Sequence, residues 1–465
     1  MKRIVIAGGG ICGLTGAMML ADDGHDVVVL ERDPAPPPGS PDEAFEWQRH
    51  GVAQFGLGHW MQARGTSILR DAAPSAMALL RDNGGFEFNL ASFLLSLQGE
   101  TPTDDDARFD LLTGRRSTIE WALATAAADH PGIEVRRGVA IDGLVADHTG
   151  GVPHVTGLRL ADGQVIDADL VVDATGRRSP TPRWLEDIGA AVPVETGEDS
   201  GFAYYGRYYR SDDGATPAMV APLLTPVGSF SVLTLPADNG TWSLTLYGMA
   251  DDAPLRRFRD EDVFDRVVSE LPLHAHWLDG EPLTEIKSMA GGVDRERAFV
   301  VDGMPCATGL VSVADAVACT NPSLGRGMTL GLMHMEMLRE SIRDHASDPM
   351  TLALEFHERT QAELKPYHEA TTTTDRRRVN AMRLARDGET PTLTPEEQIA
   401  ETMLAHASSD PVMTRAVAQI IGCTALPDEV IGQPGVLERA MELAAGPALE
   451  PAPGPDRPQL LELIG

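Results

Sequence analysis

The glycine turn near the N-terminus constrains the fold more than any other feature of this sequence. Gly8-Gly9-Gly10-Ile11-Cys12-Gly13 joins an apolar strand, residues 3–7, to a helix that ends near residue 23. In such a strand–turn–helix unit, the glycines let backbone amides approach a diphosphate at the helix N-terminus. A second strand ends at Glu31, where an acidic side chain accepts hydrogen bonds from ribose hydroxyls and favours FAD or NAD over NADP. The predicted contacts of this dinucleotide are Gly8, Gly10, Gly13, Glu31 and Arg32.

A second glycine-rich turn, NPSLGRGMTLGL from Asn321 to Leu332, lies far along the chain and also leads into a helical run. Before it come an apolar strand, residues 311–313, and the pair Ala314-Asp315. This order resembles the flavin-ribityl motif of FAD-dependent monooxygenases of the para-hydroxybenzoate hydroxylase type, the group A flavoprotein monooxygenases. The resemblance implies that Asp315 holds the ribityl chain of FAD, and that the positive end of the helix stabilises reduced flavin. The loop residues that it places around the flavin are Pro322, Gly325, Gly327 and Met328.

The sequence departs from this motif at one position, because Ala314 stands where the family has glycine. Alanine is nearly as small as glycine but resists a positive φ. The backbone conformation at Ala314 therefore decides whether Asp315 can reach the ribityl chain without strain.

Four further segments follow the order of the same family. The run Arg49-His50-Gly51-Val52-Ala53-Gln54 resembles its arginine and Gly-Val loop, which implies that the arginine reaches the diphosphate and the Gly-Val backbone touches the isoalloxazine. A helix opening at Arg115-Arg116 and a strand from Glu134 to Val139 are placed beside the linker and the adenine. Asp173-Ala174-Thr175-Gly176 resembles the Ala-Thr-Gly motif of glutathione-reductase-type FAD folds. The residues implied by these segments are Arg49, Gly51, Val52, Arg116, Val139 and Gly176.

The predicted fold class is α/β, with a glutathione-reductase-like FAD-binding Rossmann domain, an inserted antiparallel-sheet substrate domain and a helical C-terminal region. We expect residues 1–190 and 296–345 to form the discontinuous FAD-binding domain and residues 191–295 to form the inserted sheet. The remaining residues, 346–465, form the helical region. Both glycine turns then serve one ligand, because the chain leaves the FAD domain and returns to complete it.

The inserted sheet contains four of the six tyrosines of the chain, within residues 201–209. Strand alternation places Tyr205, Arg207 and Tyr209 on one face and Tyr204 and Tyr208 on the other, and the sequence does not decide which face meets the substrate cavity. These tyrosines can also simply pack a half-exposed sheet. The candidates for the cavity are Tyr205, Arg207, Tyr204, Tyr208 and His59, and no catalytic residue is assigned.

The C-terminal region offers less chemistry. Residues 351–370 and 372–386 carry dense charge with no chemical constellation, and the proline-rich tail after Gly446 is expected to be an extended surface segment.

Composition limits the partners. A net charge of −31 argues against nucleic acid and against anionic membrane surfaces. The four scattered cysteines match neither a disulfide framework nor a metal site, and no apolar run is long enough to span a membrane, so we expect a reduced, cytoplasmic protein without metal. The oligomeric state is left open.

The resemblance implies a monooxygenase whose cofactor carries the chemistry. No second dinucleotide turn occurs in strand–helix context. The resembled family needs none, and the resemblance implies that NADH or NADPH docks transiently and that a flavin C4a-hydroperoxide hydroxylates or epoxidises a small molecule. The motifs also resemble bacterial polyketide epoxidases and related tailoring oxygenases, which favours a secondary-metabolite substrate. A flavin-dependent dehydrogenase or double-bond reductase of the geranylgeranyl-reductase type is the alternative, and a non-catalytic FAD-binding scaffold a minor one. A halogenase is disfavoured, because its W-x-W-x-I-P motif is missing and only three lysines occur.

Overall fold

A computed structural model of the chain describes residues 1–52, 54–447 and 449–465; Ala53, within the predicted Arg49–Gln54 loop, and Ala448, within the proline-rich tail, lie outside it. A five-stranded parallel sheet carries both glycine turns at its carboxyl edge. Its central strand alternates between two cores, because Ile4 and Ile6 face one side and Val5 and Ala7 the other. The strand order is β21 (Leu310–Ser312), β10 (Leu170–Asp173), β1 (Arg3–Ala7), β2 (Asp26–Glu31), β6 (Ile133–Arg137).

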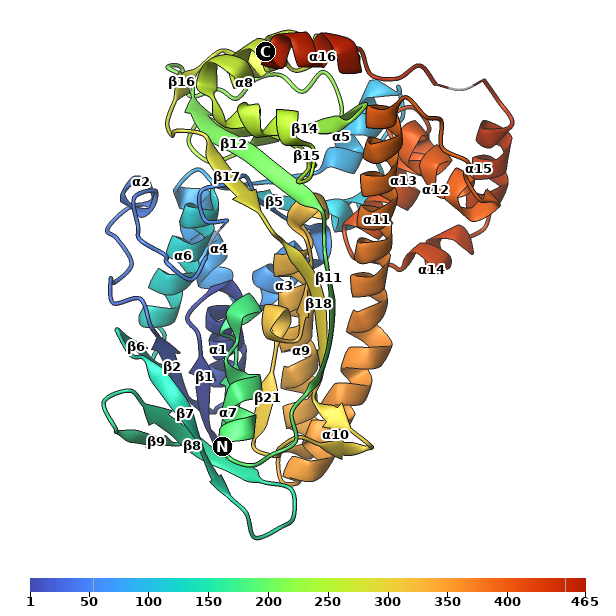
Figure 1. Cartoon of the computed structure of the whole chain (residues 1–465). Helices are drawn as coiled ribbons and strands as arrows, with labels where there is room; N and C mark the ends of the chain where they lie inside the picture. Colours follow the sequence, from blue (N-terminus) through green and yellow to red (C-terminus); the bar gives the residue numbers. More distant parts are fainter. Residues whose placement is uncertain (53, 448) are drawn as a thin grey trace.

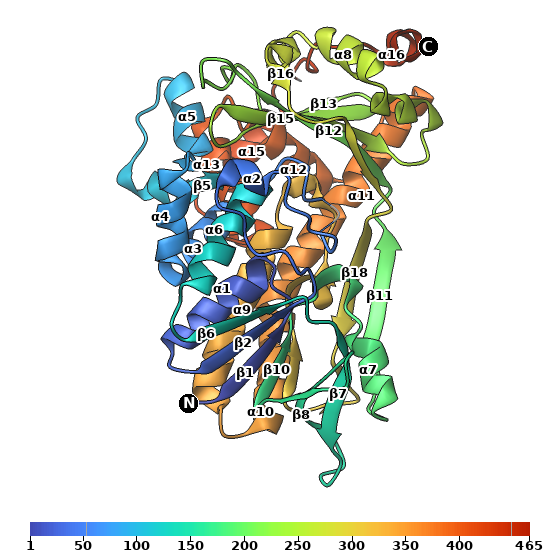
Figure 2. The ribbon, with the colours of Figure 1, turned by 90° about the vertical axis from the view of Figure 1, so that its left-hand side faces the viewer.

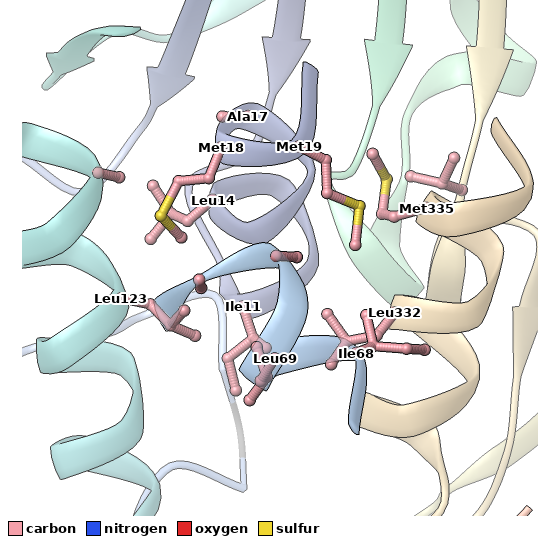
Figure 3. Packing of buried hydrophobic residues seen from close by; sticks show 14 of the residues in the cluster. Ile11, Leu14, Ala17, Met18, Met19, Ile68, Leu69, Leu123, Leu332 and Met335 are labelled. Carbon is pink, nitrogen blue, oxygen red and sulfur yellow. The ribbon is translucent and has the colours of Figure 1, made fainter. Parts of the chain in front are cut away.

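Helices cover one face of this sheet and bury its largest hydrophobic cluster. Figure 3 shows Leu14 and Met18 of α1 on the side of Leu123, and Met19 of α1 on the side of Met335. The contact between α1 and α9 is close, because a Cβ added to Gly16 would lie 2.0 Å from Cε of Met335. The helices of this layer are α1 (Ile11–Asp22), α3 (Ala63–Ala72), α6 (Arg116–Ala128) and α9 (Gly327–His345).

A small antiparallel sheet and a short helix cover the opposite face, around a second cluster that contains Val28, Leu158 and Trp184. These elements are β7 (Ile141–Asp147), β8 (His154–Leu160), β9 (Val165–Asp167) and α7 (Thr181–Asp187). The two layers hold the parallel sheet rigidly on both faces, as is usual for all-parallel sheets.

The second large sheet is antiparallel and lies at the opposite end of the molecule from the N-terminus (Figure 1). Its order is β13 (Leu224–Val227), β14 (Phe230–Pro236), β15 (Thr241–Met249), β12 (Phe202–Arg210), β16 (Glu281–Pro282), with β17 (Lys287–Ala290) also paired to β12. The paired strands β11 (Val194–Asp199) and β18 (Val293–Ala298) lead to this sheet and back again. The predicted α/β fold class, a Rossmann-type parallel sheet with an antiparallel sheet and C-terminal helices, is confirmed.

The C-terminal region is helical, and its long helix α11 (Lys365–Asp387) runs beside β11 and β18 toward the antiparallel sheet (Figure 1, Figure 2). The expectation of an extended tail is wrong at its end, because α16 (Arg457–Ile464) forms there and packs Leu460 and Ile464 into the core of the antiparallel sheet. Asp456 caps this helix, and a proline in the first turn is tolerated because its missing N–H has no intrahelical partner. None of the helices in the described parts of the chain combines the length and the apolar character needed to cross a membrane.

Candidate functional site

The two glycine turns open into one continuous cavity of about 2120 Å³ between the two sheets and the C-terminal helices. This volume exceeds the roughly 300–1,000 Å³ of common ligand sites, so it has room for a cofactor together with a second molecule. All the cofactor-binding residues predicted from the sequence line it: Gly8, Gly10, Gly13, Glu31, Arg32, Arg49, Gly51, Val52, Arg116, Val139, Gly176, Asp315, Pro322, Gly325, Gly327 and Met328. Residues that are far apart in the sequence are thus brought together.

The first turn, Gly8–Gly13, is shaped by close backbone contacts. Gly8 has a φ of +111°, and a Cβ there would lie 2.5 Å from the carbonyl oxygen of Ala174. A Cβ on Gly13 would lie 2.0 Å from the carbonyl oxygen of Gly8. Gly10 differs, because a Cβ there meets no atom within 4 Å. The turn therefore leaves open space in front of the N-terminus of α1, which has no side-chain cap.

Glu31 and Arg49 form a buried ion pair beside this turn. Arg49 Nη2 lies 3.2 Å from Glu31 Oε2 and donates to the Gly9 carbonyl, while its Nε lies 3.1 Å from Glu120 Oε2. The amide of Gly9 donates to Glu31 Oε2 at 3.1 Å. Nη1 of Arg49 is buried and has no hydrogen-bond partner among the described residues. A guanidinium N–H of this kind suits an anionic oxygen of a ligand.

The second turn, Pro322–Gly327, is held by hydrogen bonds to residues that are distant in the sequence. Gly325 has a φ of +62°, and α9 begins at Gly327 without a side-chain cap. Arg326 is buried; it donates to Thr371 Oγ1 at 3.1 Å and to the carbonyl of Ile420 at 2.6 Å. Gln62 Nε2 donates to the Leu324 carbonyl at 2.8 Å. A Cβ on Gly327 would meet no atom within 4 Å, so this helix N-terminus also opens into the cavity.

Ala314 does adopt a positive φ, +53°, although it is alanine. Its amide donates to Nδ1 of His334 on α9 at 3.1 Å, and Nε2 of this histidine lies 2.9 Å from Thr360 Oγ1. Burial lowers the pKa of His334 to about 3, so the ring is neutral, with Nδ1 as acceptor and Nε2 as donor. The neighbouring Asp315 still lines the cavity, so the strained backbone keeps it at the site.

Around Asp315 the cavity wall contains groups whose ionisation is shifted by burial. Burial raises the pKa of the Asp315 carboxyl, an effect that the Arg177 and Arg116 guanidinium groups oppose. Burial and the nearby Asp315 raise the pKa of the Cys12 thiol to about 12, so this thiol is inert. Burial and Arg116 lower the pKa of His59 to about 3. His59 Nδ1 bonds to the Leu57 carbonyl at 2.8 Å, and its Nε2 lies 3.2 Å from Arg116 Nη1.

The antiparallel sheet forms the roof of the cavity. The face of β12 that carries Tyr204 and Tyr208 meets the cavity, and only part of this face is open to it. Tyr204 lines the cavity and stacks on Tyr247 of β15 with ring centroids 5.1 Å apart. Tyr208 lies on the same face, but the loop before α3 covers it: its hydroxyl donates to the Leu57 carbonyl, and its ring packs edge-on against Phe45. Apolar residues complete the roof: Leu223, Leu233, Leu235 and Met289.

Three of the predicted cavity candidates do not line the large cavity: Tyr205, Arg207 and Tyr208. Tyr205 and Arg207 face the other side of β12. Tyr205 packs edge-on against Phe258, and the guanidinium of Arg207 lies over the ring of Tyr209. These side chains fill the core behind the sheet, which is how aromatic residues commonly act in strands. Of the predicted cavity candidates, His59 and Tyr204 line the cavity.

Sequence reasoning missed several polar groups at the second turn: Asn321, Arg326, His334, Thr360 and Asp375. Asn321 and Arg326 flank glycine-motif residues, so their position in the motif was a usable signal. His334 and Asp375 lie within long helices, where their spacing predicts nothing about a site.

The residues present fit a bound FAD. Two helix N-termini without side-chain caps face the same cavity, which suits a diphosphate at one and an electron-rich flavin ring at the other. Open space lies in front of Gly10 and Gly327, where a side chain would block a ligand. The unpaired Nη1 of Arg49 has no partner within the described chain, and a phosphate oxygen would supply one.

Comparison with known proteins agrees with this geometry. Residues 1–199 match the FAD binding domain family. Protein Rv3254 of Mycobacterium tuberculosis is 26% identical over 364 residues, which cover 73% of this chain and 72% of that protein. Among solved structures, 2-methyl-3-hydroxypyridine-5-carboxylic acid oxygenase in its tetrameric form aligns with a TM-score of 0.58 at 17% identity, over 82% of this chain and 93% of its own. The flavin-dependent brominase Bmp2 aligns with a TM-score of 0.61 at 14% identity, over 95% and 98%.

Residues 1–199 therefore form an FAD-binding domain, and the chain shares its fold over most of its length with the 2-methyl-3-hydroxypyridine-5-carboxylic acid oxygenase and with the flavin-dependent brominase. The resemblance to group A flavoprotein monooxygenases and the prediction of FAD as cofactor are confirmed.

Proposed function

We propose that this protein is an FAD-dependent monooxygenase that uses NADH or NADPH and O₂ to hydroxylate or epoxidise a small organic molecule. The observation that carries this proposal is the shared cavity: two uncapped helix N-termini and Asp315 face it at one end, and an apolar roof closes it at the other. When bound there, FAD supplies the redox chemistry. The protein contributes orientation and exclusion of water.

The site residues divide by position. We propose that the first turn holds the diphosphate of FAD, with Arg49 as a charged partner, and that Glu31 and Arg32 lie at the ribose. The second turn and Asp315 hold the flavin end, and the Gly51-Val52 backbone meets the ring. Val139 and Gly176 flank the nucleotide end, and Arg116 lies between the two ends beside His59. The support for this division is that all of these residues line one cavity.

We propose the domain division along the same lines: residues 1–190 and 296–345 bind FAD, residues 191–295 form the substrate roof, and residues 346–465 close the side. The positions of β1, β2, β10 and β21 in one sheet support the discontinuous first domain. A cytoplasmic location belongs to the same proposal, because the four cysteines are free and their thiols need a reducing setting.

The substrate is proposed to be a largely apolar secondary metabolite. The roof offers Leu223, Leu233, Leu235 and Met289 with the aromatic pair Tyr204 and Tyr247, a lining that suits aromatic or polyene molecules. No lysine lines the cavity within the described residues, and Lys365 is paired with Glu296 at 3.1 Å. This favours oxygen transfer to the substrate over halogenation, in which the cavity would need a lysine.

Labelled oxygen tests the proposal. The purified protein is loaded with FAD and given NADH or NADPH, ¹⁸O₂ and a panel of aromatic and polyene compounds, while NAD(P)H oxidation and H₂O₂ release are followed. A monooxygenase gives one ¹⁸O atom in the product, with oxidation stimulated by that compound and little H₂O₂. Anaerobic reduction of a substrate double bond would instead establish the reductase, and FAD binding without reduction by NAD(P)H the scaffold. A halogenated product formed only with added bromide or chloride would contradict the proposal.

A further inference from the structure

A buried carboxylate from the C-terminal region contacts the second turn. Asp375 lies in α11, is 2% exposed and lines the cavity. Its carboxylate accepts hydrogen bonds from Ser323 Oγ and, at 3.3 Å, from Asn321 Nδ2. These two residues flank Pro322, the first residue of the second turn. A single side chain thus holds the loop on both sides of its proline.

The same contacts lead onward to the roof. The hydroxyl of Tyr204 donates to Asn321 Oδ1 at 2.9 Å, so Asn321 joins Asp375 to the aromatic pair above the cavity. The amide of Asn321 donates to Asp294 Oδ1 on β18 at 2.6 Å. The helix α11, the second turn, β12 and β18 therefore meet in one hydrogen-bonded cluster of buried groups.

The charge on this cluster changes near neutral pH. Burial raises the pKa of Asp375 to about 7; Asp294 also raises it, whereas hydrogen bonds from Ser323 and Asn321 and the charge of Arg326 lower it. The groups that face Asp375 are Asp294 from β18, Arg326 from the start of α9, and Tyr204 and Tyr247 from the roof. An ionised carboxylate accepts both hydrogen bonds, whereas a protonated one offers one oxygen fewer as an acceptor. Protonation of Asp375 therefore weakens its hydrogen bonds to Ser323 and Asn321.

We propose that Asp375 is a positioning residue of the flavin site, whose carboxylate holds the second turn against the flavin through Ser323 and Asn321. This inference rests on the proposed function, because it assumes that the second turn meets the flavin ring. It assigns a role to a helix that lies outside the dinucleotide-binding motifs. Because Asp375 lines the cavity, the loop responds to pH at the proposed meeting place of cofactor and substrate.

The test uses the FAD-loaded protein and two readouts, the flavin absorption spectrum and the FAD dissociation constant. Both are measured between about pH 5.5 and 8.5, a range that brackets the expected titration of Asp375. The wild type is expected to show a one-proton change near neutral pH, with FAD about three- to tenfold weaker on the acid side, which is the effect of about one hydrogen bond. Asp375→Asn removes the change and keeps the weaker binding at all pH values. Ser323→Ala moves the change to higher pH, because it removes a hydrogen bond that favours the charged carboxylate.

Asp387→Asn is the matched control. Asp387 lies at the exposed end of the same helix and pairs with Arg386 at 2.8 Å, so this variant is expected to keep the wild-type transition. A transition that persists in Asp375→Asn, or a wild type with none, would overturn the inference while leaving FAD binding and the proposed function intact. A protein that takes up no FAD at any pH would overturn both together.

Discussion

The two glycine turns share one order of elements, a strand, a loop and a helix N-terminus, but they are held by different means. The first turn is fixed by its own main chain: Gly13 packs against the Gly8 carbonyl, and Gly8 against Ala174 on the adjacent strand. The second turn is fixed by side chains from distant parts of the chain, among them Gln62, the residue before α3, and Asp375 of α11. A site can therefore use the same motif twice with quite different dependence on the rest of the fold.

This difference sets what each turn tolerates. At the first turn a Cβ added to Gly8 or Gly13 would collide with main-chain atoms, which have little room to move. The hydrogen bonds at the second turn are buried and interlinked, so the loss of one partner leaves an unsatisfied group and is costly. Variants at each turn can test the contrast directly.

The largest effect is expected for Gly13→Ala. A Cβ there would lie 2.0 Å from the carbonyl oxygen of Gly8, which forces a backbone shift within the first turn. We expect the free energy of unfolding to fall by about 3 kcal/mol and FAD binding to be lost. Thermal unfolding and flavin titration measure the two effects.

Gly10→Ala is the control within the same turn, because its Cβ would meet no protein atom within 4 Å and its φ of −88° suits alanine. This variant is expected to unfold like the wild type and yet bind FAD more weakly. Equal destabilisation by both substitutions would contradict the view that Gly13 serves packing and Gly10 serves the ligand.

His334→Leu probes the side-chain support of the Ala314-Asp315 pair, which precedes the second turn. The substitution leaves the buried amide of Ala314 without a partner and removes the hydrogen bond between His334 and Thr360, whose hydroxyl still donates to the Phe356 carbonyl. We expect a loss of about 2 kcal/mol in unfolding free energy, together with weaker FAD binding, because Asp315 follows directly. His334→Gln, which retains an acceptor and a donor, should recover part of the loss. If both variants are as stable as the wild type, the second turn does not depend on this support.

The pH dependence of stability gives a test of the same histidine with a defined sign. Burial lowers the pKa of His334 to about 3 in the folded chain, below the ordinary histidine value of about 6.5, so the unfolded chain binds more protons between these values. Its stabilisation is complete above about pH 6.5 and is lost as pH falls, by up to about 1.4 kcal/mol per pH unit.

His334→Leu should therefore flatten the acid slope of the unfolding free energy by that amount. The raised pKa of Asp375 acts in the opposite direction, because the folded chain then binds more protons below about pH 7. Asp375→Asn should accordingly steepen the slope between about pH 7 and 4. A slope that neither variant changes would show that these buried groups do not titrate as the structure implies.

The same contrast explains how much of the site the sequence could predict. The first turn is encoded within a few residues, so Gly8, Gly13 and Glu31 were identifiable from spacing between a strand and a helix. The parallel sheet followed from the short β-branched strands around these motifs. The roof was predicted as an antiparallel sheet, and strand alternation separated Tyr204 from Tyr205.

The remaining features depend on contacts between elements that are distant in the sequence. Alternation along β12 could not show that the loop before α3 covers Tyr208 while leaving Tyr204 open. Asp375 lies in a charge-rich helical stretch, and nothing in that stretch distinguishes it from solvated acids until the fold buries it against Ser323. The helix α16 escaped prediction because the prolines before it suggested an extended chain, whereas its first turn tolerates proline.

The smallest effect is expected for Ala314→Gly, because Ala314, which precedes the second turn, carries strain that the first turn avoids by having glycine at Gly8. The left-handed conformation of Ala314 costs about 1–2 kcal/mol in a residue with a Cβ, whereas glycine costs about 0.5–1 kcal/mol in lost chain entropy. The difference predicts a gain of about 0.5 kcal/mol in unfolding free energy, measured by denaturant unfolding. Ala316→Gly, in the same short helical turn but without a positive φ, should instead lose about 1 kcal/mol. If Ala314→Gly destabilises the protein as much as Ala316→Gly does, the positive φ of Ala314 stores no strain. The hydrogen bond between the Ala314 amide and His334 then forms without an energetic cost.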